Sequence, residues 1–205
     1  MKCDASMTKY SFGQRILKWI AARRGLTVLL LCLVLFNFVL VGVVIHTAIE
    51  RRFLRQIEQY VDKACEEFDV PKAVVFAIIK AESDFDQHAR SSANARGLMQ
   101  ITSIALQDIN QILSENYMPN QMFDPEINIR CGTAYLSVLC QKYEKNSTVW
   151  AAYNAGQGRV DQWLLDGRYS HDQKQLYQIP FKETRNYVKK VSLYYQEYQK
   201  QYGEN

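Results

Sequence analysis

The pattern of apolar and polar positions separates one long apolar segment from a series of amphipathic segments. Residues 26–45 read LTVLLLCLVLFNFVLVGVVI, a nearly continuous apolar run in which Asn37 is the one strongly polar side chain. A helix of this length spans about 30 Å, the thickness of the hydrocarbon core of a bilayer. We therefore expect a transmembrane helix over residues 26–46.

The same run could be a secretory signal that is cleaved off, and two features argue against this. The run is longer than the apolar core of a signal peptide, and residues 44–47, Val-Ile-His-Thr, do not form a small-x-small cleavage site. Basic residues dominate before the run, which favours a cytoplasmic position for residues 1–25. Arg residues just beyond the run, at 51, 52 and 55, weaken this asymmetry. We expect an uncleaved, single-pass signal anchor in the cell membrane, with residues 47–205 on the extracytoplasmic side.

Beyond the anchor, apolar residues recur at three- and four-residue steps, which is typical of amphipathic helices. No segment shows strand alternation or a hairpin turn, so the domain over residues 47–205 is expected to be mainly α-helical. Asp69 and Pro71 are expected to start a helix, as a cap and a first-turn residue. The expected helices cover residues 49–68, 71–83, 98–112, 127–143, 149–158, 161–165 and 183–199.

The helix over residues 71–83 places a carboxyl group in an unusual position. Val74 and Ile78 lie on its apolar stripe, and Glu82 follows Ile78 by one helical turn, so Glu82 lies on the same side. Glu82 is also at the helix C-terminus, where the helix dipole disfavours an anion. Both features favour the protonated carboxyl group, the form that a general acid requires. A Glu at a helix end is more often simply solvated, so this position alone does not identify a catalyst.

Composition and charge exclude several classes of site. The chain is 48% hydrophobic with a formal net charge of +4, a balance too small to indicate nucleic-acid binding. It suits an anionic polymer, a membrane surface or ordinary surface variation equally well. The five cysteines and three histidines are scattered, without the spacing of metal ligands. We predict no metal and no organic cofactor, and we expect Cys65, Cys131 and Cys140 to be small buried residues, although Cys65 could pair with either of the others.

Five short motifs follow one another in order along the rest of the chain. They are Glu82-Ser83, Ser91 followed by GLMQ at 97–100, DPEINI at 124–129 with Gly132 and Tyr135, AYNAG at 152–156, and IPFKETRNYV at 179–188. Together they resemble the soluble lytic transglycosylase (SLT) family, the family 1 lytic transglycosylases of bacterial cell walls, over residues 55–200. The resemblance implies a lysozyme-like fold. Asn94 stands where the family usually has Gly, and Asn tolerates the left-handed backbone that such a turn needs.

The resemblance also implies an activity. Enzymes of this family cleave the β-1,4 bond between N-acetylmuramic acid and N-acetylglucosamine in peptidoglycan and form a 1,6-anhydromuramoyl end. By this resemblance, Glu82 is catalytic, first as the acid that protonates the glycosidic oxygen and then as the base for the muramoyl 6-hydroxyl. Most glycosidases use two carboxylates. Asp84 and Asp86 are nevertheless expected to be solvated loop residues, with the substrate's N-acetyl group in place of a second carboxylate.

Six further residues are expected to bind substrate by the same resemblance, and several have a structural alternative. Ser91 could instead stabilise a turn, and Asn154 could bond the backbone around Gly156. Glu183 could cap the last helix or pair with Arg185. Tyr187 is expected to serve packing more than chemistry. The expected substrate-binding residues are Ser91, Met99, Gln100, Tyr153, Asn154 and Glu183.

The expected partners are peptidoglycan glycan strands and the membrane, with no nucleic acid; an envelope-spanning assembly stays open. Two alternative functions also remain at this point. One is a hydrolytic muramidase on the same fold, which would release reducing ends. The other is a catalytically silent wall-binding module.

Overall fold

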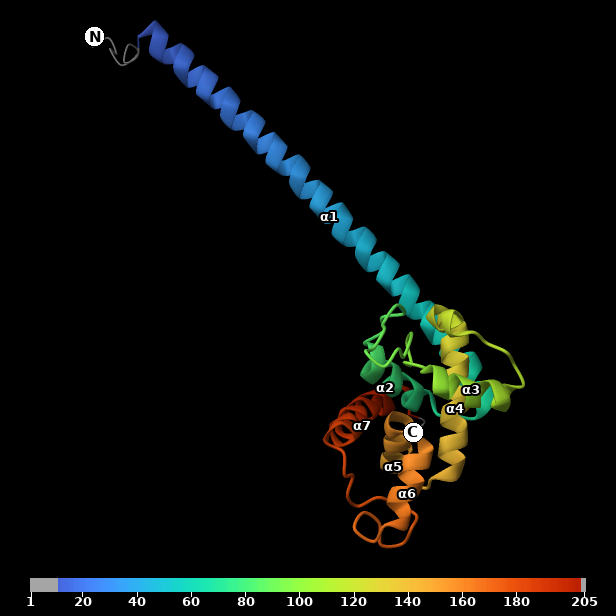
Figure 1. The fold of residues 1–205 in the computed structure, drawn as a ribbon. Helices are drawn as coiled ribbons and strands as arrows, with labels where there is room; N and C mark the ends of the chain where they lie inside the picture. Colours follow the sequence, from blue (N-terminus) through green and yellow to red (C-terminus); the bar gives the residue numbers. More distant parts are fainter. Residues whose placement is uncertain (1–10, 204–205) are drawn as a thin grey trace. The chain divides into compact units, whose positions relative to one another are not determined.

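The structure, a computed structural model, describes residues 11–203 and consists of helices joined by loops (Figure 1). Within that range β-pairing is limited to two isolated bridges, Arg90 with Arg96 and Arg96 with Ile101. The expected mainly α-helical architecture is therefore confirmed. The chain divides into two units, one up to Leu54 and one from Arg55 onward, and each is described by itself.

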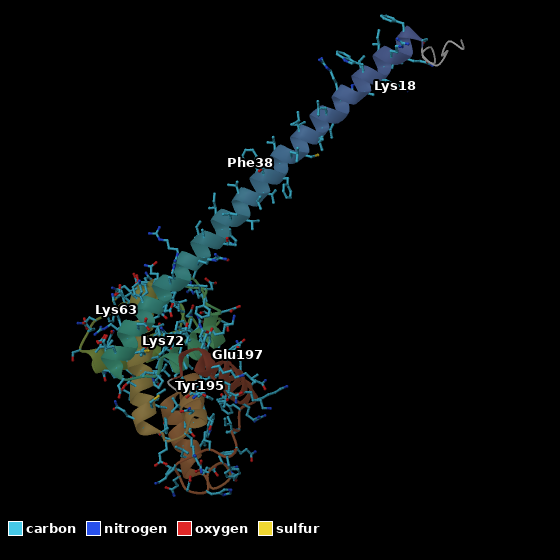
Figure 2. The ribbon with its side chains drawn as sticks, turned by 180° about the vertical axis from the view of Figure 1, so that it is seen from behind. Lys18, Phe38, Lys63, Lys72, Tyr195 and Glu197 are labelled. Atoms are coloured by element: carbon cyan, nitrogen blue, oxygen red, sulfur yellow. The ribbon has the colours of Figure 1, made fainter. Side chains whose placement is uncertain are left out.

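The first unit contains most of helix α1 (Phe12–Phe68), which carries the apolar run. Residues 28–41 of α1 expose their apolar side chains on every side, as Figure 2 shows for Phe38. In the described part of the chain, α1 is the one helix long and apolar enough to cross a membrane, with a mean hydropathy of 3.2 in its most apolar window. By length and composition alone, an apolar helix near the N-terminus can also be a secretory signal. The Asn37 amide donates to the Leu33 carbonyl at 2.9 Å, which partly satisfies this polar group inside the helix itself.

The second unit holds the end of α1 and all later elements. Its helices agree with the expected ones in number and order, and the turn-rich segment before residue 125 contains a short 3₁₀ helix. The elements are α2 (Lys72–Ser83), α3 (Ser103–Leu113), η1 (Pro119–Phe123), α4 (Pro125–Lys142), α5 (Asn146–Ala155), α6 (Gln157–Leu165) and α7 (Lys182–Tyr202).

The expected starts of α3, α5 and α6 differ from the observed ones by several residues, and that of α3 differs most. α3 begins at Ser103 instead of residue 98, because Gly97 and Gln100 have positive φ angles of 74° and 50° and close a turn before it. Thr102 then caps the helix, since its hydroxyl accepts a hydrogen bond from the Ala105 amide at 3.1 Å. The expected start of α2 near Pro71 is confirmed to within one residue, but Asp69 does not cap this helix.

Helix α4 runs through the core of the second unit. It packs against α3, η1 and α5, while α7 covers both α2 and α5 (Figure 1). Ile129, Leu136 and Leu139 of α4 are completely buried. Gly132 of α4 leaves room for Met99, because a Cβ atom there would lie 2.4 Å from the Met99 sulfur. The loop before α3 can therefore pack directly on the α4 backbone.

Asn128 of α4 holds this loop in place. It is completely buried, and its Oδ1 accepts a hydrogen bond from the Met99 amide at 2.7 Å. Its Nδ2 donates to the carbonyl oxygens of Arg96 at 2.9 Å and Met122 at 2.8 Å. One side chain thus satisfies three buried backbone groups and ties the loop to η1 and α4.

We expect Asn128→Asp to destabilise the fold at neutral pH. A carboxylate can accept the hydrogen bond from the Met99 amide, but it has no hydrogen to donate to the two carbonyl oxygens. Those oxygens would lose their hydrogen bonds and would lie next to a second acceptor in a buried place. Leaving the two carbonyl oxygens unpaired costs roughly 1–3 kcal/mol each, so the free energy of unfolding measured by urea denaturation should fall by about 2–6 kcal/mol. Asn120→Asp, at an exposed position of η1, is the matched control and should stay within about 0.5 kcal/mol of the parent. Equal stability of the two variants would contradict this role of Asn128.

Candidate active site

Glu82 lies in the last turn of α2, and its neighbours are fixed from two sides. The Ser83 hydroxyl donates to the Leu98 carbonyl at 2.8 Å, which joins the helix end to the loop before α3. From α7, the Lys190 ammonium donates to the Ala81 carbonyl at 2.6 Å. Asp84 then ends the helix in a left-handed conformation, with φ 52°. The half-buried Glu82 side chain is therefore held between α7 and the loop.

Burial has a large effect on the protonation of this side chain. Loss of hydration raises the pKa of Glu82 from 4.5 to about 7, in the direction expected from its place on the apolar stripe. Two groups on α7, the Tyr187 hydroxyl and the charge of Lys190, act in the opposite direction and lower the pKa by less than burial raises it. A carboxyl group with a pKa near 7 can both donate and accept a proton at neutral pH.

Tyr187 was expected to serve packing more than chemistry, but its hydroxyl lies close enough to the Glu82 carboxyl group to affect the pKa of that group. Its ring is buried, and its hydroxyl makes no hydrogen bond of ordinary geometry within the described residues. Burial and the neighbouring Glu82 carboxyl both raise the pKa of Tyr187. Lys190 was also missed. A signal was available for it, because it follows Tyr187 by three residues and so lies on the same face of α7.

A cavity of about 350 Å³ lies next to this centre, between the loop before α3, α3 itself, α4 and the α5–α6 junction. Tyr153 lines the cavity, and its hydroxyl donates to the Met99 carbonyl at 2.8 Å. Glu82 does not line the cavity, but its charge, together with burial, raises the pKa of Tyr153. Tyr153 is therefore the residue that links the Glu82 carboxyl to the cavity.

Three of the expected substrate-binding residues line this cavity: Gln100, Tyr153 and Asn154. Gln100 also closes the loop, since its amide donates to the carbonyl oxygens of Ala89 at 3.1 Å and Gly97 at 2.9 Å. The Asn154 side chain makes no hydrogen bond in the described part of the chain. The alternative in which the Asn154 side chain bonds the backbone around Gly156 is therefore wrong.

The other three lie elsewhere. Ser91 accepts a hydrogen bond from the Ala95 amide at 3.1 Å, as the turn-stabilising alternative predicts. That turn contains Asn94 with φ 59°, so the expected left-handed conformation is confirmed. Met99 is completely buried against α4 and does not line the cavity. Glu183 is exposed in the first turn of α7, without a hydrogen bond or ion pair in the described residues.

No second acidic side chain accompanies Glu82 among the groups that shift its pKa. Asp84 is exposed and pairs with Lys80. Asp86 is also exposed and accepts a hydrogen bond from the His88 amide at 2.8 Å. Both are therefore solvated loop residues, as expected, and the site is built around a single carboxyl group.

The described cysteines do not line the cavity and are not paired with one another. The four described cysteines, at 32, 65, 131 and 140, are free, and burial raises the pKa of the Cys65 thiol to about 11 and that of Cys131 to about 12. Among residues 11–203, His, Cys, Asp and Glu side chains do not gather in groups of three that could hold a metal ion.

We expect Glu82→Gln to stabilise the fold at neutral and alkaline pH. The pKa of Glu82 in the folded state, about 7, exceeds its ordinary value of 4.5, so the unfolded chain loses this proton first as the pH rises. The stability that this group contributes is complete below about pH 4.5 and is lost as the pH rises through 7. Above about pH 8 the variant should be more stable than the parent by roughly 3 kcal/mol, and near pH 4.5 the gain should vanish.

Urea unfolding at several pH values measures this difference. Glu66→Gln, which removes an exposed carboxyl group of α1, controls for the loss of one negative charge. A stability difference between the Glu82 variant and the parent that does not change with pH would contradict the raised pKa.

Comparison with known proteins agrees with this geometry. Residues 59–178 match the family described as Transglycosylase SLT domain. A putative soluble lytic murein transglycosylase of Haemophilus influenzae is 40% identical over 144 residues, which cover 66% of this chain and 23% of that protein. Membrane-bound lytic murein transglycosylase C of Sodalis glossinidius is 32% identical over 160 residues, 64% of this chain and 43% of that protein.

Solved structures show the same fold. An inactive Glu-to-Gln mutant of lytic transglycosylase Slt from Pseudomonas aeruginosa superposes with a TM-score of 0.60 at 32% identity, over 70% of this chain and 24% of that one. The 70-kDa soluble lytic transglycosylase in complex with bulgecin A superposes with a TM-score of 0.64, over 76% and 26%. This chain spans about a quarter of the length of these soluble relatives. The domain match covers more than half of the chain, and the chain belongs to the transglycosylase SLT domain family.

Proposed function

We propose that this protein is a peptidoglycan lytic transglycosylase, a lyase that breaks the β-1,4 bond between N-acetylmuramic acid and N-acetylglucosamine. The observation that carries the proposal is the single half-buried carboxyl group of Glu82, whose pKa of about 7 suits both the donation and the acceptance of a proton. Support comes from the relatives, which are named lytic murein transglycosylases. In the Pseudomonas aeruginosa relative, a Glu-to-Gln mutant is inactive.

The proposed reaction has two proton transfers. Protonated Glu82 gives its proton to the glycosidic oxygen, the bond from that oxygen to C1 of the muramoyl sugar breaks, and N-acetylglucosamine leaves with a 4-hydroxyl group. The carboxylate then takes the proton of the muramoyl 6-hydroxyl while that oxygen bonds to C1. The ring that closes is the 1,6-anhydro product, no water is consumed, and Glu82 ends protonated as it began.

The residues around Glu82 have distinct parts in this scheme. The ammonium of Lys190 favours the carboxylate that forms after the first transfer. The Tyr187 hydroxyl, which has no other partner, is free to donate to that carboxylate or to substrate. Gln100, Tyr153 and Asn154 line the adjacent cavity and are the proposed contacts to the sugars, whereas Met99, Ser91 and Glu183 lie outside it.

A hydrolytic muramidase is the competing reaction on this fold. It would need a water molecule at C1 in place of the muramoyl hydroxyl, usually held by a second carboxylate. The exposed positions of Asp84 and Asp86 argue against this, because neither shifts the pKa of Glu82. A silent wall-binding module is disfavoured by the raised pKa of Glu82, which serves no purpose in binding a neutral sugar.

Product analysis tests the proposal. We expect the purified full chain to release 1,6-anhydromuramoyl fragments from peptidoglycan, detected by mass spectrometry. Glu82→Gln should reduce the rate at least ~10²-fold, the usual scale for a general acid. Glu66→Gln, on the exposed face of α1, should keep the parental rate. Reducing muramic acid ends would establish the muramidase instead, and unchanged activity of Glu82→Gln would exclude this residue as the acid.

We also propose that the apolar part of α1 is an uncleaved single-pass anchor and that residues 47–205 lie on the wall side of the cell membrane. The apolar window of α1 and the membrane-bound relatives indicate membrane association. The basic residues before the apolar run support this orientation. Substrate would then be limited to the glycan strands closest to the bilayer.

Protease added to intact protoplasts tests the topology. We expect the SLT domain to be digested from outside, while an uncut chain stays with the membrane pellet after an alkaline wash. A cytoplasmic protein in the same protoplasts should stay intact as the control. Protection of the domain would contradict the orientation, and a shortened, soluble chain would show that the segment is a cleaved signal.

A further inference from the structure

The cavity beside Glu82 has an uneven distribution of charge. Twelve of the residues that line it are uncharged, and Asp108 is the one charged side chain among them. The proposed substrate has many neutral hydroxyl and N-acetyl groups, which the Gln, Asn, Thr and Tyr side chains of the lining can bind. A carboxylate in such a wall accepts hydrogen bonds only, and its strongest partner is a charged N–H donor.

Asp108 is available for a ligand. It is half-buried on α3, and in the described part of the chain it makes no hydrogen bond and no ion pair. The position of α3 is well defined, because Thr102 caps its first turn and Leu106 and Ile109 on its other side are buried. The carboxylate is thus held at the wall of the cavity by the helix and is not neutralised by a protein cation.

The contacts also show where Asp108 lies relative to Glu82. The charge of Glu82 acts on the Tyr153 hydroxyl, and the Tyr153 ring lies 5.8 Å from the Tyr135 ring between centroids. The charge of Asp108 acts in turn on Tyr135, where, after burial, it raises the pKa of the phenol. Pairwise interactions therefore link Glu82 to Tyr153, Tyr153 to Tyr135 and Tyr135 to Asp108, and the last three of these residues line the cavity. The two tyrosines thus separate Asp108 from Glu82, and the part of the cavity beside Asp108 is called its far end here.

We propose that Asp108 makes this end of the cavity a subsite for a cationic amino group carried by the substrate. The inference rests on the proposed function, since it takes the cavity as the glycan groove. Two sources supply such a group: an amino sugar whose N-acetyl group has been removed, and the side-chain amine of a peptide attached to the glycan. Both present an ammonium N–H to the carboxylate, and the experiment separates them.

Binding is measured by calorimetry with the full chain in detergent, in the Glu82→Gln background so that the ligands stay intact. The sugar arm compares the tetramer of N-acetylglucosamine with the same tetramer after partial de-N-acetylation. The peptide arm compares muropeptides that carry a free side-chain amine with the same muropeptides after acetylation of that amine. In at least one arm, we expect the amine-bearing ligand to bind about 3- to 10-fold more tightly at low salt, with a smaller ratio at high salt.

Substitutions of Asp108 then test whether this residue causes the preference for the amine-bearing ligand. Adding Asp108→Asn should abolish the preference and leave the affinity for the neutral ligand within about twofold, whereas Asp108→Glu should keep part of the preference. Glu66→Gln, outside the cavity, should keep all of it. Thermal melting of each variant verifies that the fold is intact. The arm in which the preference occurs identifies the source of the amine.

Two results would overturn the inference: equal affinity for amine-bearing and neutral ligands in both arms, or a preference that survives Asp108→Asn. These results are distinct from a failure of the proposed function. Anhydromuramoyl products without any amine preference would refute the subsite alone. An Asp108-dependent preference in a protein that releases no anhydromuramoyl product would refute the transglycosylase and leave an amine-binding groove.

Discussion

Packing of α7 against α2 removes the Glu82 carboxyl group from water, and the chemistry of the site depends on this burial. The cost of ionising a buried carboxyl group moves its pKa to about 7, and the neighbouring Tyr187 hydroxyl and Lys190 ammonium keep it from moving further. Both groups come from one face of α7. Without these two groups the pKa would be higher and the carboxyl group a poorer source of carboxylate at neutral pH, and without burial the pKa would be lower and the group a poorer acid. The balance between burial and the α7 groups therefore allows both roles.

Most residues of the short sequence motifs stabilise the loop before α3, and few of them face the Glu82 carboxyl group. Asn128 and Gln100 use their amides on backbone carbonyls, Ser83 ties α2 to the loop, and Gly132 leaves space for Met99. These residues shape one polar loop against α4 so that the Tyr153 hydroxyl meets the Met99 carbonyl. A loop with so many buried backbone groups needs each of them paired, which explains why amide and hydroxyl side chains are concentrated there.

The sequence predicts the local features of this structure and not the long-range ones. Helical periodicity places Glu82 on a buried stripe, and the direction of its pKa shift follows from that. Periodicity says which face of α7 is buried but not what that face meets, so the contact of Lys190 with Ala81, 109 residues earlier, could not be predicted. Met99 shows the same limit, because Met suits both a groove and a core, and only the missing side chain at Gly132 determines which one it occupies. The start of α3 at Ser103 could not be predicted, because Gln100 adopts a left-handed conformation that its residue type does not favour.

The two ends of the proposed groove differ in charge, and this difference bears on how a strand enters it. Lys190 supplies a positive charge near Glu82, and Asp108 supplies a negative charge beyond Tyr135. Neutral sugars would make similar contacts to the polar lining in either direction, but in the proposed reaction only one direction would present the bond to be cleaved to Glu82. A charged group at a fixed position on the strand meets Asp108 in one of the two directions only. The carboxylate would therefore favour one direction of binding even where its contribution to affinity is small, because specificity depends on the difference between the two binding free energies.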